Sequence, residues 1–117
     1  MPHATSIEIL KKGFTAAGVL QAHRFFTRAL VRAGAGVSTL GVTDHEAKLG
    51  EEFPGILMGS AKVEVGAAVD STVAYVESDA DGRAIARTTG KIAGIVMPGS
   101  TPTAVGQLIE ILVVQTP

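Results

Sequence analysis

The segment VESDADGRAIA, residues 76–86, carries the clearest structural signal in the chain. Asp-Gly between two alternating apolar runs is a strong hairpin signal, because Gly82 adopts positive φ without strain and Asp81 tolerates the left-handed region. The D-x-D-G spacing also occurs in calcium loops, but those need a bidentate Glu at the twelfth position, which here is Gly90. The segment therefore predicts a turn between two strands rather than a metal site.

The second half of the chain consists of pieces of strand length separated by turn residues. Val63 and Val65 alternate with Lys62 and Glu64, as in a half-buried strand. Many short strands at close spacing are typical of a β-sandwich or small barrel. We therefore predict an all-β fold with at most one short helix, near residues 101–108. The expected strands are 55–59, 61–66, 71–78, 83–87, 91–97 and 107–114.

The first half is less regular, and we divide it into an arm and the start of the domain. Residues 6–11 alternate as a strand and are followed by an extended connector, so residues 1–18 are expected to form an N-terminal arm. Residues 19–117 are expected to form a single β-rich domain. Within it, residues 19–34 fit either an amphipathic helix or a bent strand pair, and periodicity does not choose between them.

Composition limits the functions open to the chain. Its 117 residues correspond to about one domain, and the net charge of −1 gives no reason to expect a nucleic acid or an anionic membrane as partner. No cysteine is present, which excludes disulfides and thiolate chemistry. We also expect no secretory signal and no membrane span, because no apolar run approaches about 18 residues.

Few side chains are arranged for catalysis. Asp44 and His45 are adjacent and His23 lies upstream, but successive residues of an extended segment point to opposite faces and do not converge on one ion. No serine lies in a nucleophile elbow. We therefore predict no catalytic residue, metal site or cofactor, so that the chain is not an enzyme. A small metal-dependent enzyme using these three residues is kept as a lesser alternative.

A second alternative is a carrier domain. The stretch IVMPGSTPTAVGQLIEILV (95–113) resembles lipoyl and biotinyl carrier domains, which attach their cofactor to a lysine at a hairpin tip. The tip-like lysines are Lys62 and Lys91, and neither has the neighbours usual in that family.

The order of turns and strands over residues 36–114 resembles another family, the small capsid decoration (head cement or stabilising) proteins of tailed double-stranded DNA bacteriophages. These proteins share turn glycines, a G-x-A-x-V strand, a D-x-D-G-R/K-A hairpin and a late G-x-x-I-E strand. The corresponding places here are Gly41-Val42, Gly59–Val65, Val69–Val76, Asp79–Ala84, Gly94 and Gly106–Leu112.

The resemblance implies a compact β-sandwich or β-tulip-like barrel that acts by binding. Such proteins assemble as homotrimers on threefold axes outside the expanded lattice of the major capsid protein, after synthesis in the host cytoplasm. An extended arm suits strand addition, because it presents backbone donors and acceptors beside alternating apolar side chains. The expected capsid-binding arm residues are Thr5, Ser6, Ile7, Glu8, Ile9 and Leu10. The candidate trimer or capsid contacts are Arg24, Phe25, Phe26 and Arg28.

Overall fold

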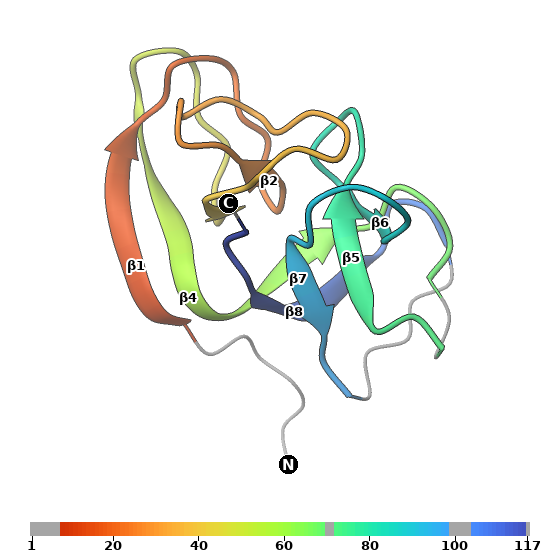
Figure 1. Cartoon of the computed structure of the whole chain (residues 1–117). Helices are drawn as coiled ribbons and strands as arrows, with labels where there is room; N and C mark the ends of the chain where they lie inside the picture. The colour runs from red at the N-terminus through yellow and green to blue at the C-terminus, as the bar shows by residue number, and fades with distance from the viewer. Residues whose placement is uncertain (1–7, 70–71, 99–103, 117) are drawn as a thin grey trace.

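The computed structural model describes residues 8–69, 72–98 and 104–116 and consists of short strands joined by turns (Figure 1). No helix occurs among these residues, so none of them forms a helix long and apolar enough to cross a membrane. The strands are β1 Glu8–Thr15, β2 Phe25–Phe26, β3 Gly41–Thr43, β4 Glu52–Glu64, β5 Tyr75–Ser78, β6 Ala84–Ala86, β7 Gly94–Val96 and β8 Leu108–Val113.

β4 is the central strand and belongs to both halves of the sheet. Its first half pairs antiparallel with β1 and β3, and its second half, from Ser60 to Glu64, pairs with β8. Two separate strands, residues 55–59 and 61–66, were expected here, with the first ending at Gly59. That expectation was wrong because Gly59, at φ 97°, continues the strand in a conformation open to glycine instead of ending it.

The second half of β4 begins a nearly closed barrel. The strand order continues from β4 through β8, β7 and β5 to β6. A parallel bridge between Val65 and Ala84, with the Gly66 N–H donating to the Ala84 carbonyl at 2.9 Å, then joins β6 back to the end of β4. The prediction of an all-β small barrel is confirmed.

The interior is divided into two apolar clusters, one in each half of the molecule. The barrel cluster is built mainly from aliphatic residues that alternate inward, among them Val63, Val76 and Ile111, and it also contains Phe25. The second cluster lies under β1 and holds three phenylalanine rings, with Phe26 at 5.8 Å from Phe14 and 5.1 Å from Phe53 between ring centroids. Such tilted and edge-to-face contacts stabilise aromatic groups beyond the area they bury.

The hairpin predicted at residues 76–86 is present as β5, a tight turn and β6. The Gly82 N–H donates to the Asp79 carbonyl at 3.2 Å, and Gly82 has φ 75°. The Asp79 carboxylate accepts the N–H groups of Asp81 and Arg83 at 2.8 and 2.9 Å. The turn chemistry read from the sequence therefore holds, and Asp79 adds a side-chain cap to it.

Residues 19–34 form no helix, and the bent strand pair expected as the alternative is present in short form: Phe26 bridges Arg32 antiparallel, and the Ala33 N–H donates to the Phe25 carbonyl at 3.0 Å. Only Phe25 and Phe26 are in a strand, and His23 and Leu30 adopt φ of 60° and 64°, which ends any regular structure nearby. Residues 11–15, expected as a connector, instead continue β1, because Phe14 packs into the phenylalanine cluster.

Candidate functional site

β1 is an open edge of the sheet. It pairs with β4 on one side, and no other described strand lies on its second side (Figure 1). β3 pairs with the same part of β4, so β1 and β3 must lie on opposite sides of that strand. An unpaired edge of this length exposes backbone donors and acceptors to which another strand can add.

The register shows which backbone groups face the open side. Gly13 lies opposite Pro54, whose carbonyl accepts the Asp44 N–H at 3.3 Å and therefore points toward β3. Gly13 and Pro54 thus form a pair without mutual hydrogen bonds, and the N–H and C=O of Gly13 point away from β4. By alternation the same groups of Thr15 also point outward, whereas Ala16 donates to Glu51 on the β4 side.

A group of exposed apolar side chains lies at the N-terminal end of β1. Ile9 is 70% exposed and Leu10 is 44% exposed, and Leu10 lies opposite Met58, which is 52% exposed. We call these three residues the β1 apolar end. Of the predicted arm residues, Glu8, Ile9 and Leu10 are in β1, and Thr5, Ser6 and Ile7 lie outside the described residues.

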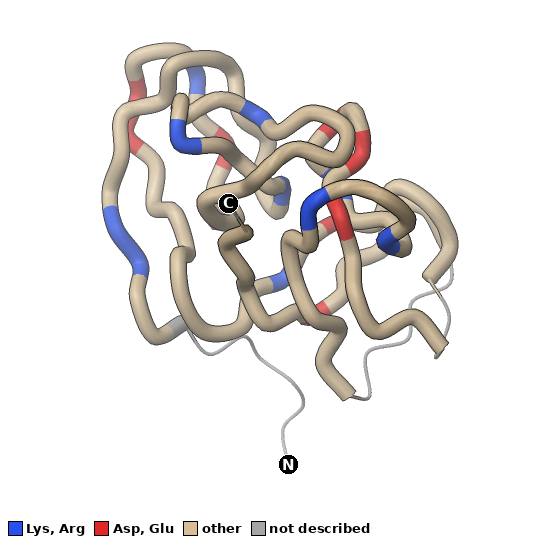
Figure 2. The backbone as a smooth tube through the Cα atoms, in the orientation of Figure 1, with Lys and Arg blue, Asp and Glu red and all other residues tan. Residues whose placement is uncertain are grey.

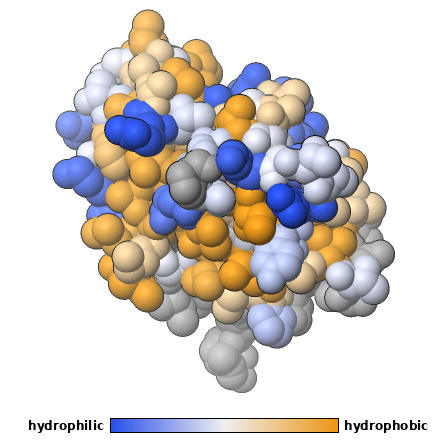
Figure 3. Space-filling model, viewed as in Figure 1, coloured by the Kyte–Doolittle hydropathy of each residue, from blue (hydrophilic) through white to orange (hydrophobic). Residues whose placement is uncertain are grey.

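A second apolar group crosses the outer face of the barrel. Leu112 of β8 pairs with Ile95 of β7, which pairs with Tyr75 of β5. Their strand neighbours Ile111 and Val76 are fully buried, so these three side chains point outward, and we call them the outer row. Figure 3 shows apolar side chains over β1 and β4 and again over β7 and β8.

The second predicted contact set is only partly on the surface. Phe25 and Phe26 are wholly buried, so the prediction that they contact a partner is wrong; they are core residues. Arg24 is also largely buried, with its guanidinium 3.3 Å from the Glu64 carboxylate. Only Arg28 of this set is exposed. Adjacent residues of a strand point to opposite faces, so Phe25 enters the barrel cluster and Phe26 enters the phenylalanine cluster.

Arg24 belongs to a charged network beneath the hairpin tip that sequence reasoning missed. It donates to the Asp81 carbonyl at 3.0 Å, and Glu64 also lies 3.7 Å from Arg83. Arg83 lies 3.4 Å from the carboxylates of both Asp79 and Asp81. The network joins β4, the hairpin and the segment before β2. No local signal identifies it, because Arg24 and Glu64 lie far in sequence from the hairpin residues that they meet.

The candidate metal ligands are not gathered into a site. Within the described residues, no group of three or more histidine and acidic side chains is placed to hold a metal ion. The Asp44 carboxylate instead accepts a hydrogen bond from the Lys11 ammonium at 2.8 Å. This hydrogen bond lowers the pKa of Asp44 below its ordinary value, against a smaller opposing effect of burial.

The two candidate carrier lysines lie in different settings. Lys62 lies inside β4, opposite Glu110, and not at a hairpin tip. Lys91 is exposed on the connection between β6 and β7. In the view of Figure 2, acidic and basic residues are interspersed along the described chain.

Comparison with known proteins gives a match to a solved structure. No protein-family model matches the sequence, and no curated protein matches it. The crystal structure of the N base of head fiber gp8.5 from bacteriophage phi29 superposes with a TM-score of 0.70, covering 92% of this chain and 98% of that chain at 12% identity. The chain therefore has the fold of a phage head fiber base.

Proposed function

We propose that this chain is a capsid-associated protein of a tailed bacteriophage, which binds the outside of the expanded head and stabilises it. The observation that carries the proposal is the fold shared with the phi29 head fiber base over nearly the full length of both chains. The order of hairpin and turn residues supports it independently, because it resembles that of capsid decoration proteins.

The major capsid protein is the partner, and the open edge of β1 is the surface that meets it. A strand of the capsid protein adds to β1 through the outward N–H and C=O groups of Gly13 and Thr15. The β1 apolar end supplies side-chain contacts beside those hydrogen bonds, because Ile9, Leu10 and Met58 leave water on binding. The predicted arm residues Thr5, Ser6 and Ile7 are assigned to the same contact as Glu8, Ile9 and Leu10.

Three copies occupy each threefold axis of the capsid lattice. A homotrimer matches the symmetry of such a position, so each copy meets the shell in the same way. We assign the contacts between copies to the outer row, where Tyr75 and Leu112 are 48% and 40% exposed. Three linked copies bind more tightly than one, because each bound copy raises the effective concentration of the others at the surface.

The protein acts by binding, without catalysis or a cofactor, and resides on the exterior of the virion after synthesis in the host cytoplasm. The charged side chains near the candidate metal ligands and near the hairpin tip support a binding role. They form ion pairs that hold segments of the chain together. Lys11 with Asp44 and Arg24 with Glu64 are examples.

Co-sedimentation with capsids tests the proposal. The purified chain is mixed with unexpanded and expanded shells assembled from the major capsid protein encoded with it. We expect saturable binding to expanded shells, a trimer in the bound layer by electron cryomicroscopy, and a higher temperature of shell disruption. Absence of binding to expanded shells would refute the capsid role. Binding as isolated single copies would refute the trimer.

A further inference from the structure

The two lysines in the middle of β1 have different surroundings. The Lys11 ammonium lies 2.8 Å from the carboxylate of Asp44, the residue after β3, so Lys11 extends across the sheet and away from the open edge. Lys12 is exposed, and its side chain makes no hydrogen bond or ion pair with a residue that the structure describes. Glu52 lies opposite Thr15, three positions along β1, and therefore belongs to the other face. One positive charge of β1 is left for a partner.

The phenylalanine cluster prevents Lys12 from lying over β4. Lys12 lies opposite Gly55, so the side-chain positions of these two residues are on the same face of the sheet. A Cβ placed on Gly55 would lie 2.6 Å from Phe26 Cζ and 3.1 Å from Phe14 Cδ2. The two rings therefore fill the space above Gly55, and the Lys12 side chain remains in solvent at the edge.

A strand added to this edge meets Lys12 at close range. The N–H and C=O of Gly13 point to the open side, so those of the neighbouring Lys12 point to β4. On the open side, Lys12 therefore belongs to the type of pair without mutual hydrogen bonds, in which the two Cα atoms are only about 4.5 Å apart. Opposite charges attract across such a pair and like charges repel, so the charge opposite Lys12 influences which strand is accepted.

A second copy of β1 is a poor partner for this edge. Two copies paired antiparallel about Lys12 would place the two Lys12 side chains directly opposite each other. Pairing about Gly13 would place them on a diagonal, about 7–8 Å apart. Both arrangements bring like charges together, and natural proteins use lysine on edge strands to prevent sheets from joining.

We propose that Lys12 selects the strand that adds to β1: it admits a strand of another protein with an Asp or Glu opposite Lys12, and it rejects a second copy of this chain. This inference deepens the proposed function and rests on it for the identity of the partner, the major capsid protein. The backbone groups of Gly13 and Thr15 and the β1 apolar end supply most of the affinity. The Lys12 charge supplies the choice of partner, which is the usual effect of electrostatic complementarity.

Nuclear magnetic resonance titration of the full chain tests the selection. The probes are acetyl-Thr-Val-Thr-Glu-Thr-Val-Thr-amide and its counterpart with Lys in place of Glu. We expect the Glu peptide to shift the amides of Gly13 and Thr15 and to bind about two- to fivefold more tightly than the Lys peptide, the range of an exposed ion pair. Lys12→Gln should remove this preference, and Lys12→Glu should reverse it. Lys91→Gln removes an exposed charge on the connection between β6 and β7 and should leave the preference unchanged.

The rejection of a second copy is tested without a ligand. In the wild type, the amide shifts of Gly13 and Thr15 should stay constant as the protein concentration is raised. Lys12→Gln should make them depend on concentration, because the repulsion between two edges is lost. Adding Gly13→Pro to Lys12→Gln should make the Thr15 shift constant again, since proline removes a donor that the pairing needs.

Several results would overturn the proposal. Equal affinity for the two peptides, a preference unchanged by Lys12→Glu, or no response of Gly13 and Thr15 to either peptide would refute the selection. Constant shifts in Lys12→Gln would refute the rejection of a second copy. Equal binding of wild type and Lys12→Glu to expanded shells would leave the capsid role intact and refute the selection. A wild-type chain that prefers the Glu peptide but does not bind expanded shells would retain the selection and lose the capsid role.

Discussion

Glu77 is joined to Gly90 by a hydrogen bond from the Gly90 N–H to the Glu77 carboxylate, 3.0 Å long. The same oxygen accepts the Thr88 N–H at 2.7 Å, and Glu77 is only 7% exposed. A Cβ placed on Gly90 would lie 2.6 Å from the Gly36 Cα, so the backbones of the two glycines are in close contact. The carboxylate of β5 therefore holds the connection between β6 and β7 against the turn before β3.

Replacing Glu77 tests this anchor. Glu77→Ala leaves the N–H groups of Thr88 and Gly90 without their acceptor, so we expect a loss of about 2–4 kcal/mol in the free energy of unfolding. Glu77→Gln keeps an acceptor oxygen and should lose roughly half as much. Urea unfolding measures both variants, with amide exchange at Thr88 and Gly90 as a local readout. Equal stability of wild type and Glu77→Ala would contradict the anchor role.

The glycine of the hairpin turn, Gly82, gives a second prediction: alanine should destabilise the fold more at Gly82 than at Gly106. Gly82 has φ 75°, and a Cβ there would lie 2.9 Å from Arg32 Cγ and 3.1 Å from the Phe25 carbonyl oxygen. Gly106 has φ 91° with nothing within 4 Å. Gly106→Ala should therefore lose only about 1 kcal/mol from backbone strain. Gly82→Ala should lose about 2–3 kcal/mol, because it adds a steric conflict. Equal urea midpoints for the two variants would show that the close contacts are readily relieved.

Short sequence patterns correctly predicted two elements, the hairpin of β5 and β6 and the strand β8, because both follow from residues close together in sequence. The hairpin at 76–86 follows from its Asp-Gly turn, and β8 follows from the alternation of Ile109 and Ile111 with Glu110. The prediction that a glycine ends a strand was wrong at Gly59, because a glycine can also lie within a strand that continues. What decides between the two outcomes is whether a partner strand continues, and that partner, β8, comes about fifty residues later.

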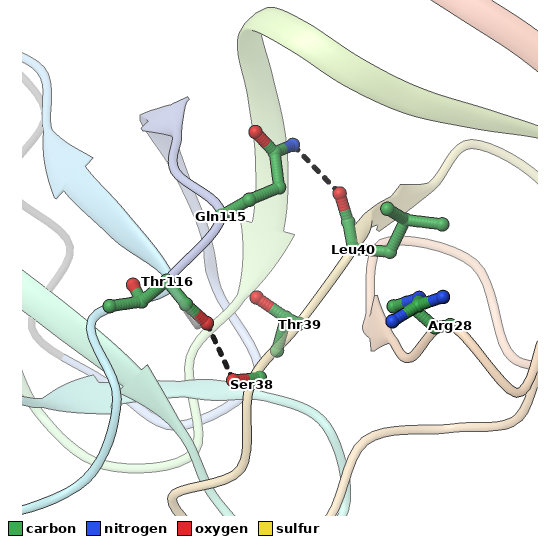
Figure 4. A pocket seen from close by; sticks show the side chains of 6 residues that line it. All are labelled: Arg28, Ser38, Thr39, Leu40, Gln115 and Thr116. Carbon is green, nitrogen blue, oxygen red and sulfur yellow. Dashed lines mark hydrogen bonds between the residues drawn. The ribbon is translucent and has the colours of Figure 1, made fainter.

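The candidate site depended on contacts that no sequence window contains. Phe26 is buried because Phe14 and Phe53, from two other strands, pack against it. The residues next to Phe26 in sequence therefore do not predict its burial. The outward direction of the Gly13 backbone depends on its register with Pro54. The hydrogen bond from the Gln115 side chain to the Leu40 carbonyl joins the C-terminal segment to the residues before β3, 75 positions earlier (Figure 4). Each of these relationships is set by chain topology.

The pair of Lys11 and Asp44 gives a pH-dependent prediction. The Lys11 hydrogen bond lowers the folded-state pKa of Asp44 below its ordinary value of 3.8. A depressed carboxyl pKa stabilises the fold above the unfolded-state pKa, and this stabilisation is lost as pH falls through the folded-state pKa. The stability difference between wild type and Asp44→Asn should therefore be constant from neutral pH to about pH 5 and vanish in stronger acid.

The size of this difference should be small. Both side chains are partly exposed, so water screens the ion pair and the contribution stays below about 1 kcal/mol. Urea unfolding at several pH values measures it, and 0.5 M salt should reduce it further. A difference that grows as the pH falls would have the wrong sign for a depressed pKa.

The open edge of β1 predicts opposite effects of proline at two adjacent positions. The Gly13 N–H points away from β4, so Gly13→Pro removes a donor that the fold does not use, and edge strands tolerate proline. Lys12 lies opposite Gly55 in the alternate, hydrogen-bonded type of pair, so Lys12→Pro should break the ladder and lower the urea midpoint.

Gly13→Ala keeps the N–H, and its Cβ meets nothing within 4 Å. We expect Gly13→Pro to remain folded but to bind expanded capsids about tenfold more weakly, because it can no longer donate to an added strand. Gly13→Ala should bind as wild type does. Full capsid binding by a folded Gly13→Pro protein would show that the capsid strand does not add at this edge.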